Sequence, residues 1–386
     1  MISLNLIVFV ACLLVGLLGA MFIYTPIANK YTQTFEIKPY MLPFSYILVF
    51  YICGTLAIYY LLPNNDFIQK LTATRALVPL VLAAVIFVSS MLFSRITLAL
   101  ITFACVAFTV WLQPFGEGFP YPQIPVWAAK ILLTLFFAVF CIFYGVMNSL
   151  PQIMAVPTII ILFAVSVLSA FSAAPAYLAL SAALLIGPLL GYLSVNLNII
   201  RIPFDNGSCC ALAYLVANIL LLDVSEFSFG SCLIFTNVFW AELLVAMWNK
   251  FIIIKSGPLY EHTLYYQAAE KFNMRVLLIN ISRISAIGMF IGWFQLYAIN
   301  QYSLILVSLA VLLWLNYNFL NPTETKNIKQ INKQMLADIK ENIFDVKNSL
   351  SNIGETQPQK TIKKTGTRKK TSSSKKTNTR KKRQAD

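Results

Sequence analysis

The sequence predicts an all-α protein: a polytopic bundle of about 11 membrane-spanning helices, then an amphipathic helix and a disordered basic tail. Hydrophobic residues make up 59% of the 386 residues and charged residues only 11%, whereas soluble domains carry about 25% charge. The mean hydropathy is +0.73. This composition excludes a soluble globular protein, a collagen, a disulfide scaffold and a fully disordered chain.

Charge is divided unevenly along the chain. From Asn321 to Asp386 the sequence holds 17 of the 29 Lys and Arg residues and 6 of the 15 Asp and Glu residues, so this segment carries +11 of the net charge of +14. We therefore divide the chain into a membrane body over residues 1–320, a cytoplasmic amphipathic helix over 321–352 and a polybasic tail over 353–386.

The predicted spans are apolar runs that approach the roughly 20 residues a helix needs to cross a bilayer. They cover 3–24, 43–63, 74–93, 96–113, 125–147, 157–172, 174–195, 209–223, 229–250, 277–298 and 302–320. The first run lacks the basic residues that begin a signal peptide and continues through Ile23, so it is interpreted as a span.

Basic residues predict the orientation, because cytoplasmic loops carry an excess of Lys and Arg. With the tail in the cytoplasm, an odd number of spans places the N-terminus outside. The cytoplasmic loops then hold Lys30, Lys38, Arg95, Arg201, Lys250, Lys255, Lys271 and Arg275. The loops on the other side hold Lys70 and Arg75 together with Glu117, Asp223 and Glu226.

Side chains that carry chemistry are scarce in the body. His262 is the only histidine of the chain, which argues against sites built from several histidines. The seven cysteines lie mostly inside apolar runs and are interpreted as small hydrophobic residues. Almost no carboxylate is expected to be buried, because charge inside a span is costly. Polar chemistry is therefore expected in the longest cytoplasmic connections, 191–208 and 250–275.

The segment from Gly187 to Leu222 reads GPLLGYLSVNLNIIRIPFDNGSCCALAYLVANILLL. It resembles a region of the polyprenyl-phosphate sugar-1-phosphate transferases, in which a helix ends in G-F-L-x-x-N, a basic residue follows, and F-M-G-D-x-G-S opens the next helix. The corresponding residues here are Gly191, Asn196, Arg201, Asp205, Gly207 and Ser208. The interval from the asparagine to the aspartate is one residue shorter than in that family.

This resemblance implies a chemistry and a place in the cell. Enzymes of that family, such as the phospho-N-acetylmuramoyl-pentapeptide transferases, join a sugar phosphate from a nucleotide sugar to a polyprenyl-phosphate carrier. The resemblance therefore implies both molecules as partners, Mg²⁺ as the cofactor of an active enzyme, and a bacterial inner membrane in which cell-envelope glycans are made.

Several positions depart from the family's pattern. Ser89 and Ser90 stand where the family has an Asp pair at the end of the third span. In GVMNSLPQIMA, Asn148 is kept, but Met154 stands at a further Asp of the family's N-A-x-N-x-x-D-G. The loop after the ninth span, KSGPLYEHTLYYQAAEKF, offers only His262 where the family has a histidine-rich motif. Because Mg²⁺ usually needs one or two carboxylates, the resemblance implies a kept fold with impaired or lost catalysis.

By the same resemblance, the candidate catalytic positions are Asp205, Ser89 and Ser90, and Asp205 is also the candidate metal ligand. The candidates for substrate binding are Asn148, Asn196, Arg201, Gly207, Ser208 and His262. From the residues alone, Asp205 is either the N-cap of the next helix or a ligand of Mg²⁺. For His262 the residues alone favour an ordinary loop residue over a catalytic one, and for Glu261 and Glu270 they favour solvated charges.

The C-terminal region has two parts. From Asn327 to Leu350 apolar residues recur at every third or fourth position, which predicts an amphipathic helix that lies on a membrane or pairs with another helix. Between Lys360 and Arg383, 12 of 24 residues are basic and none is acidic. This composition predicts a disordered tail that binds anionic lipid or stays solvated. Nucleic acid is a further alternative, although no aromatic residue is present for base stacking.

Functions from different classes fit these observations. The first is a catalytically impaired transferase-like protein that binds a polyprenyl carrier or scaffolds partners in a homo- or hetero-oligomer. The second is an active transferase with relocated carboxylates, using Asp205 with Glu261 or Glu270. The third is an unrelated transporter or membrane-complex subunit, although neither internal repeats nor charged midplane helices are evident.

Overall fold

The structure, a computed structural model, describes only part of the chain. The described residues are 2–34, 41–61, 73–113, 125–146, 151–171, 176–198, 202, 204–226, 229–252, 257–269, 274–295, 307, 310, 311, 313 and 314. The chain divides into two units, Met1–Pro322 and Thr323–Asp386. The amphipathic helix and basic tail predicted for 321–386, and most of the last predicted span, lie outside the described residues.

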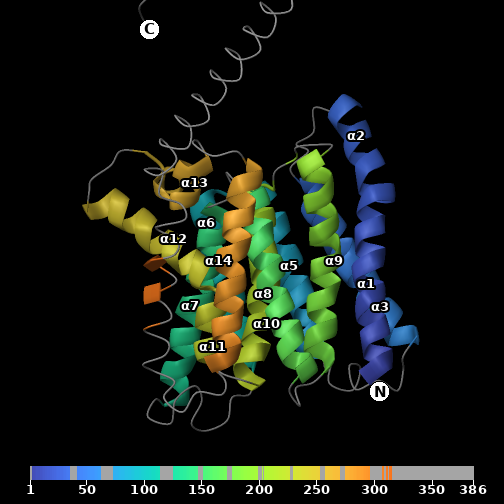
Figure 1. Ribbon diagram of the computed structural model, residues 1–386, viewed down its shortest axis with the longest axis horizontal. Coiled ribbons are helices and arrows are strands. Elements are labelled where there is room, and N and C mark those ends of the chain that lie inside the picture. Colours follow the sequence, from blue (N-terminus) through green and yellow to red (C-terminus); the bar gives the residue numbers. More distant parts are fainter. Residues whose placement is uncertain are drawn as a thin grey trace, which may run out of the picture. The chain divides into compact units, whose positions relative to one another are not determined.

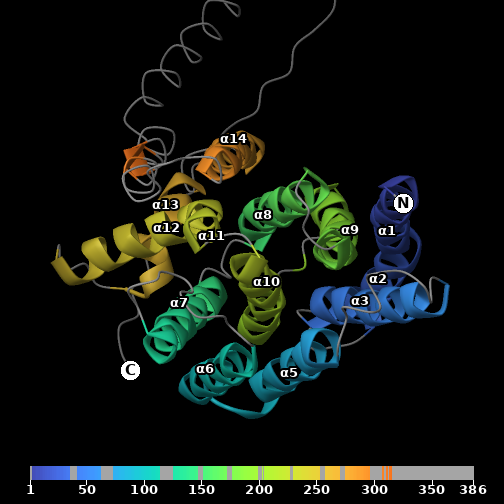
Figure 2. The ribbon, with the colours of Figure 1, turned by 90° about the horizontal axis from the view of Figure 1, so that it is seen from below.

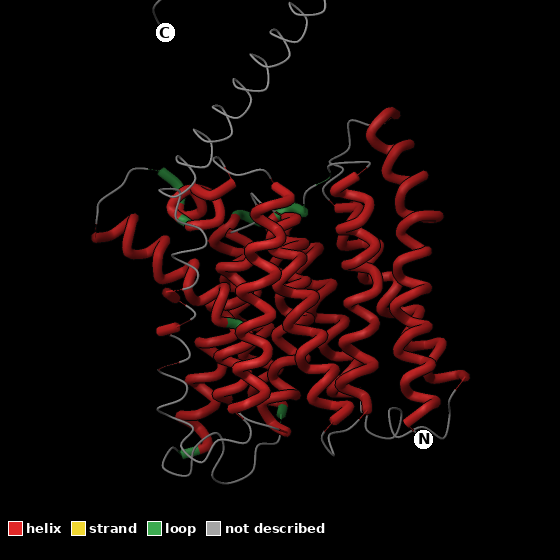
Figure 3. The backbone as a smooth tube through the Cα atoms, viewed as in Figure 1, coloured by secondary structure: helices red, strands yellow, loops and turns green. Residues whose placement is uncertain are grey.

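The described residues form helices and no strand, which confirms the predicted all-α class (Figure 3). Helices long and apolar enough to cross a membrane cover Leu6–Ala28, Arg95–Leu112, Val126–Val146, Leu178–Leu197 and Val276–Trp293. Shorter apolar helices cover Leu42–Ile58, Val78–Leu92, Met154–Ser169 and Asn206–Leu221. The part of the chain described is thus compatible with an integral membrane protein, while the number of spans stays a prediction.

The helices follow the predicted spans in order (Figure 1). They are α1 (Ile2–Gly19), the π-helical turn η1 (Ala20–Tyr24), α2 (Thr25–Thr34), α3 (Leu42–Leu61), α5 (Ala73–Leu92), α6 (Arg95–Leu112), α7 (Val126–Val146), α8 (Pro151–Phe171), α9 (Ala176–Asn198), α10 (Asn206–Glu226), α11 (Phe229–Phe235), α12 (Asn237–Met247), the π-helical turn η4 (Trp248–Ile252), the 3-10 turn η5 (Leu259–His262), α13 (Leu264–Ala269) and α14 (Met274–Gln295).

The predicted span 229–250 is not one straight helix. Thr236 lies between α11 and α12 with φ −88° and ψ 6°. Its hydroxyl donates to the carbonyl of Cys232 at 2.8 Å and accepts from the indole Nε1 of Trp240 at 3.0 Å. The carbonyl of Cys232 also accepts the backbone N–H of Thr236 at 3.1 Å, and such back-bonding by the hydroxyl of a Ser or Thr often bends a helix. Beyond the break, α12 and η4 lean away from α11 (Figure 1).

The centre of the described bundle is α10. Figure 2 shows it surrounded by α5, α6, α7, α8 and α9. Every residue from Gly207 to Leu221 is buried. Apart from Asn218 and the hydroxyl of Tyr214, residues of this stretch are apolar or small, so the helix has no face that must meet water. This position places the start of α10 among the ends of several neighbouring helices.

The end of the bundle at which α9 finishes and α10 begins is called here the site end. It is the upper end in Figure 1, where α13 also lies. The antiparallel order of the helices brings the last turns of α5 and α7 and the first turns of α6, α8 and α14 to the same end. Residues that are far apart in the sequence can therefore meet there.

Candidate functional site

Asp205 and Ser90 meet at the site end, although 115 residues separate them. The hydroxyl of Ser90 lies 3.2 Å from Oδ2 of Asp205 and donates a hydrogen bond to it. The same hydroxyl lies 2.7 Å from the carbonyl oxygen of Phe87, one turn earlier in α5. Because a hydroxyl carries one proton, Ser90 donates to only one of these two acceptors at a time.

Gly207 explains how α5 and α10 come so close. A Cβ built on Gly207 would lie 1.9 Å from Cβ of Ser90, far inside van der Waals contact. Any side chain at this position would push the two helices apart. The glycine proposed from the resemblance as a binding residue therefore acts here by letting Ser90 reach Asp205.

Asp205 is the N-cap of α10. Its Oδ1 accepts the backbone N–H of Ser208 at 2.9 Å, and its carbonyl oxygen accepts the backbone N–H of Cys209 at 3.0 Å. Such a cap stabilises a protein by about 1 kcal/mol. The cap uses Oδ1 and the contact with Ser90 uses Oδ2, so the carboxylate joins the start of α10 to the end of α5.

Asn196 fastens the connection between α9 and α10. Its Oδ1 accepts the backbone N–H of Ile202 at 2.7 Å, and its Nδ2 donates to the hydroxyl of Tyr192 at 2.8 Å. The Tyr192 hydroxyl in turn donates to the carbonyl oxygen of Ile202 at 3.0 Å. Both backbone groups of Ile202 are thus held by α9, which leaves Asn196 in a structural role in this conformation.

Only some of the other predicted site residues lie near Asp205 in the described part of the chain. Ser89 is buried beside Ser90, and the serine that bonds to Asp205 is Ser90. Ser208 is fully buried, and its hydroxyl oxygen has no partner among the residues that the structure describes. Asn148 and Arg201 lie outside the described residues. The structure therefore brings together Ser90, Asp205, Gly207 and Ser208.

His262 lies on a different element. It ends η5, and only 4% of its surface is exposed. Its carbonyl oxygen accepts a hydrogen bond from Nδ2 of Asn249 at 3.0 Å, while its Nε2 has no partner within the described part of the chain. The side chain of His262 is therefore buried within a short 3-10 turn.

Glu242 is the residue that sequence reasoning missed. It lies in α12, is completely buried, and accepts the backbone N–H of Tyr265 on Oε2 at 3.2 Å. Its Oε1 has no partner among the described residues. The expectation of almost no buried carboxylate overlooked it. A signal was present, since a lone Glu inside the apolar run 229–250 is a functional hypothesis by default.

Tyr265 lies beside this carboxylate and is itself completely buried. Burial raises the pKa of the Tyr265 phenol well above its usual value, and ionisation of Glu242 beside it would raise the pKa further. The phenol is therefore protonated at neutral pH. Its hydroxyl has no partner in the described part of the chain.

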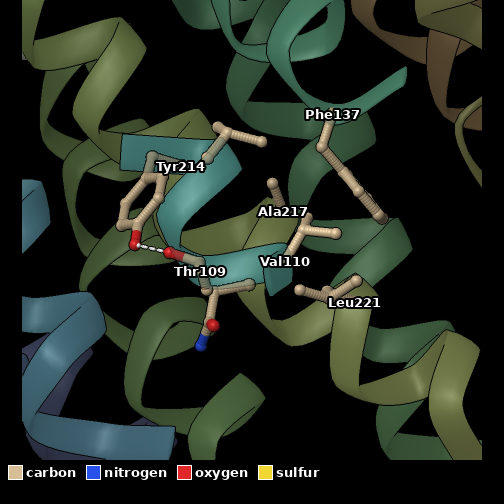
Figure 4. Close-up of a pocket in the computed structure, with 8 residues that line it drawn as sticks. Thr109, Val110, Phe137, Tyr214, Ala217 and Leu221 are labelled. Carbon is tan, nitrogen blue, oxygen red and sulfur yellow. Dashed lines mark hydrogen bonds between the residues drawn. The ribbon is translucent and has the colours of Figure 1, made fainter. Parts of the chain in front are cut away.

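A small cavity lies among α6, α7 and α10 (Figure 4). The hydroxyl of Tyr214 lies 2.5 Å from that of Thr109, which also lies 2.8 Å from the carbonyl oxygen of Cys105. The remaining lining residues are Val106, Val110, Phe137, Ala217, Asn218 and Leu221. This lining carries no charge to recognise a phosphate, so the cavity is not the candidate substrate site.

The fit of a divalent cation depends on Asp205. Among the described residues no three His, Cys, Asp or Glu side chains gather in a way that could hold a metal ion. Mg²⁺ commonly keeps waters and binds one or two carboxylates together with substrate phosphates. Asp205 supplies one such carboxylate, so a cation here would depend on phosphate oxygens from a ligand.

Comparison with known proteins adds no family to this picture. No protein-family model matches the chain, and no curated protein is similar to it. The function is therefore argued from the geometry of the site and from the resemblance of the motif.

Proposed function

We propose that this protein is a catalytically impaired, transferase-like membrane protein that binds a polyprenyl-phosphate carrier at its site end during cell-envelope glycan assembly. The observation that carries this proposal is the contact between Ser90 and Asp205. The resemblance assigns both positions to acidic residues of one site, and their contact across two helices supports this assignment.

The groups at this site explain why the protein would bind a lipid phosphate without efficiently transferring a sugar phosphate to it. Separation of charge in sugar-phosphate transfer calls for cations and preorganised charge at the reacting phosphates. Among the described residues, Asp205 is the one carboxylate that joins the contact between α5 and α10, and it already accepts the N–H of Ser208 and the hydroxyl of Ser90. No second carboxylate of the described residues joins this contact to share the charge of the reaction. A carboxylate and a bound Mg²⁺ suffice to hold a lipid phosphate, and Mg²⁺ would supply the positive charge for it.

The proposal includes a topology of about 11 spans, with the site end in the cytoplasm and the N-terminus outside. Basic residues support this orientation. Lys30, Arg95 and Lys250 lie in elements at the site end, and Lys130 lies near the opposite end of α7. The basic tail, with its 12 Lys and Arg residues between Lys360 and Arg383, would then meet the anionic inner leaflet.

The test uses the full chain in nanodiscs, with polyprenyl phosphate and a panel of nucleotide sugars. We expect Mg²⁺-dependent binding of polyprenyl phosphate that Asp205→Asn weakens at least tenfold, and no release of nucleoside monophosphate. Glu261→Gln is the matched control and should bind like the wild type. Turnover that requires Asp205 and Glu261 would instead establish the active transferase with relocated carboxylates. Absence of binding by the wild type would overturn the proposal.

A further inference from the structure

Residues 257–269, which comprise η5 and α13, are called here the docked segment. Side chains of α12 and η4 hold this segment by its backbone. Glu242 Oε2 accepts the N–H of Tyr265 at 3.2 Å, Asn249 Nδ2 donates to the carbonyl of His262 at 3.0 Å, and Lys250 Nζ donates to the carbonyl of Gly257 at 2.8 Å. Each contact joins a side chain to a main-chain atom.

The spacing of these contacts shows that they form one interface. Glu242 and Asn249 are seven positions apart, about two helical turns, so they lie on the same face of the α12–η4 stretch. On the docked segment they meet Tyr265 and His262. Lys250 secures the beginning of the segment, at the turn where Gly257 has a φ of +118°. The segment is therefore held along most of its length.

Glu242 is the most deeply placed of these side chains. It is fully buried, as is Tyr265, whereas Asn249 and Lys250 are partly exposed. Loss of one partner of a buried hydrogen bond leaves the other without water and is more costly than loss of an exposed one. Glu242 should therefore contribute most to holding the segment.

A continuous line of packing leads from Glu242 to Asp205. Phe239, one turn before Glu242, stacks on Tyr144 of α7 with 5.3 Å between ring centroids and 26° between planes. The next residue, Gly145, lies against α10, where an added Cβ would be 2.5 Å from Sγ of Cys210 and 3.3 Å from the carbonyl oxygen of Asn206. Asn206 directly follows Asp205.

We propose that Glu242 is a positioning residue for the site at Asp205. It fixes the docked segment to α12, and the packing of α12 on α7 and of α7 on α10 carries this constraint to the start of α10. The inference rests on the proposed function only in calling Asp205 a ligand-binding group. The mechanical link between Glu242 and the start of α10 stands without any ligand.

The experiment is hydrogen–deuterium exchange on the full chain without ligand. The wild type is compared with Glu242→Leu, Glu242→Gln and the control Leu244→Ala, whose parent side chain is exposed on the same helix. We expect Glu242→Leu to raise exchange at least about fivefold in peptides covering 257–269 and also in peptides covering 204–211. Glu242→Gln should keep most of the protection, because its amide oxygen still accepts the N–H of Tyr265.

The outcomes separate the parts of the inference. Unchanged exchange at 257–269 in Glu242→Leu would show that Glu242 does not hold the segment. A change at 257–269 without one at 204–211 would overturn the link to Asp205. If exchange rises as much in Glu242→Gln as in Glu242→Leu, a side-chain oxygen that accepts the N–H of Tyr265 is not what holds the segment.

A second variant covers the case in which Glu242→Leu does not fold. Asn249→Leu removes the middle contact, and we expect the same two groups of peptides to exchange about twofold faster. Unchanged exchange in this variant would contradict the inference.

Binding of polyprenyl phosphate is measured separately on the same variants. Weakened binding in Glu242→Leu with recovery in Glu242→Gln is expected. Absence of binding by every variant and the wild type, together with the expected exchange pattern, would reject the proposed function and leave the positioning role of Glu242 intact.

Discussion

Two peripheral contacts of this molecule are built on opposite principles. α1 packs on α9 through close approach of backbones. A Cβ on Gly16 would lie 2.6 Å from the backbone carbon of Gly187, and a Cβ on Gly191 would lie 2.3 Å from Cβ of Ala20. The docked segment, in contrast, is held on α12 and η4 by side chains that reach across to main-chain atoms.

The difference shows what each contact depends on. In membranes, small residues four positions apart let helices approach and gain van der Waals contact. Gly187 and Gly191 on α9 face Gly16 of α1 and Ala20 of η1 in this way, so this contact does not tolerate larger side chains. The contact of the docked segment depends instead on a few polar atoms, of which Glu242 Oε2 is the most buried.

The strongest test of the close-packed contact is Gly16→Leu. The new side chain would collide with backbone atoms of Gly187 and Pro188, which cannot move aside. We expect a loss of about 3 kcal/mol or more in stability, at the upper end of the cost of overpacking, and separation of α1 from α9. Thermal unfolding monitored by size exclusion measures it. Val15→Phe, at an exposed position of α1, is the control and should leave the melting temperature unchanged.

Gly207→Ala applies the same test at the site. The added methyl group would overlap Cβ of Ser90, so α5 and α10 must separate and the hydrogen bond from Ser90 to Asp205 must break. We expect a loss of about 2 kcal/mol, seen as a lower midpoint in chemical denaturation. The double variant Gly207→Ala with Ser90→Gly removes the obstacle and should recover part of the loss. If the double variant is no more stable than Gly207→Ala, contacts other than the one with Ser90 keep α5 and α10 apart.

Tyr46→Phe probes the polar contact at the margin of the close-packed interface. The Tyr46 hydroxyl donates to the carbonyl oxygen of Gly16 at 2.6 Å. Its removal should destabilise the protein by about 1 kcal/mol, since this carbonyl also belongs to the helical ladder of α1. Differential scanning fluorimetry detects such a change. A loss as large as that of Gly16→Leu would contradict the view that shape dominates this contact.

The smallest effect is expected from Lys250→Met. Its ammonium group donates to the carbonyl oxygen of Gly257 at the surface. Surface substitutions usually change stability by no more than about 0.5 kcal/mol, and the methionine keeps the apolar stem. Unfolding midpoints of this variant and the wild type should agree closely. A large decrease in the unfolding midpoint would show that the contact at the beginning of the docked segment contributes more to stability than Glu242 does.

Hydropathy predicts helix ends where polar residues border an apolar run. The predicted spans 74–93 and 96–113 differ from α5 and α6 by one residue at each end. Hydropathy does not predict the break at Thr236, because the run 229–250 is apolar on average and the bend depends on local hydrogen bonds. Hydropathy also misses that α1, η1 and α2 continue to Thr34, because the helix extends past the apolar run into polar residues.

The site was only partly accessible from the sequence. The motif indicated that Asp205, Gly207 and Ser208 open a helix, and capping of α10 by Asp205 shows this local geometry. The contact with Ser90 is a tertiary event over 115 residues, which no local pattern encodes and which only the resemblance suggested. Glu242 escaped notice because hydropathy averages over a span and hides a single acidic residue within it.

The docked segment is recognised through its main chain, and this has a consequence for design. Every amino acid except proline offers the same amide N–H and carbonyl oxygen, so the partners of Glu242 and Asn249 do not depend on which side chains the segment carries. The partner of Lys250 is Gly257, whose φ of +118° favours glycine. Libraries that randomise its solvent-facing positions should retain the native trace of the segment. The site end can thus be given new surface chemistry while its scaffold stays the same.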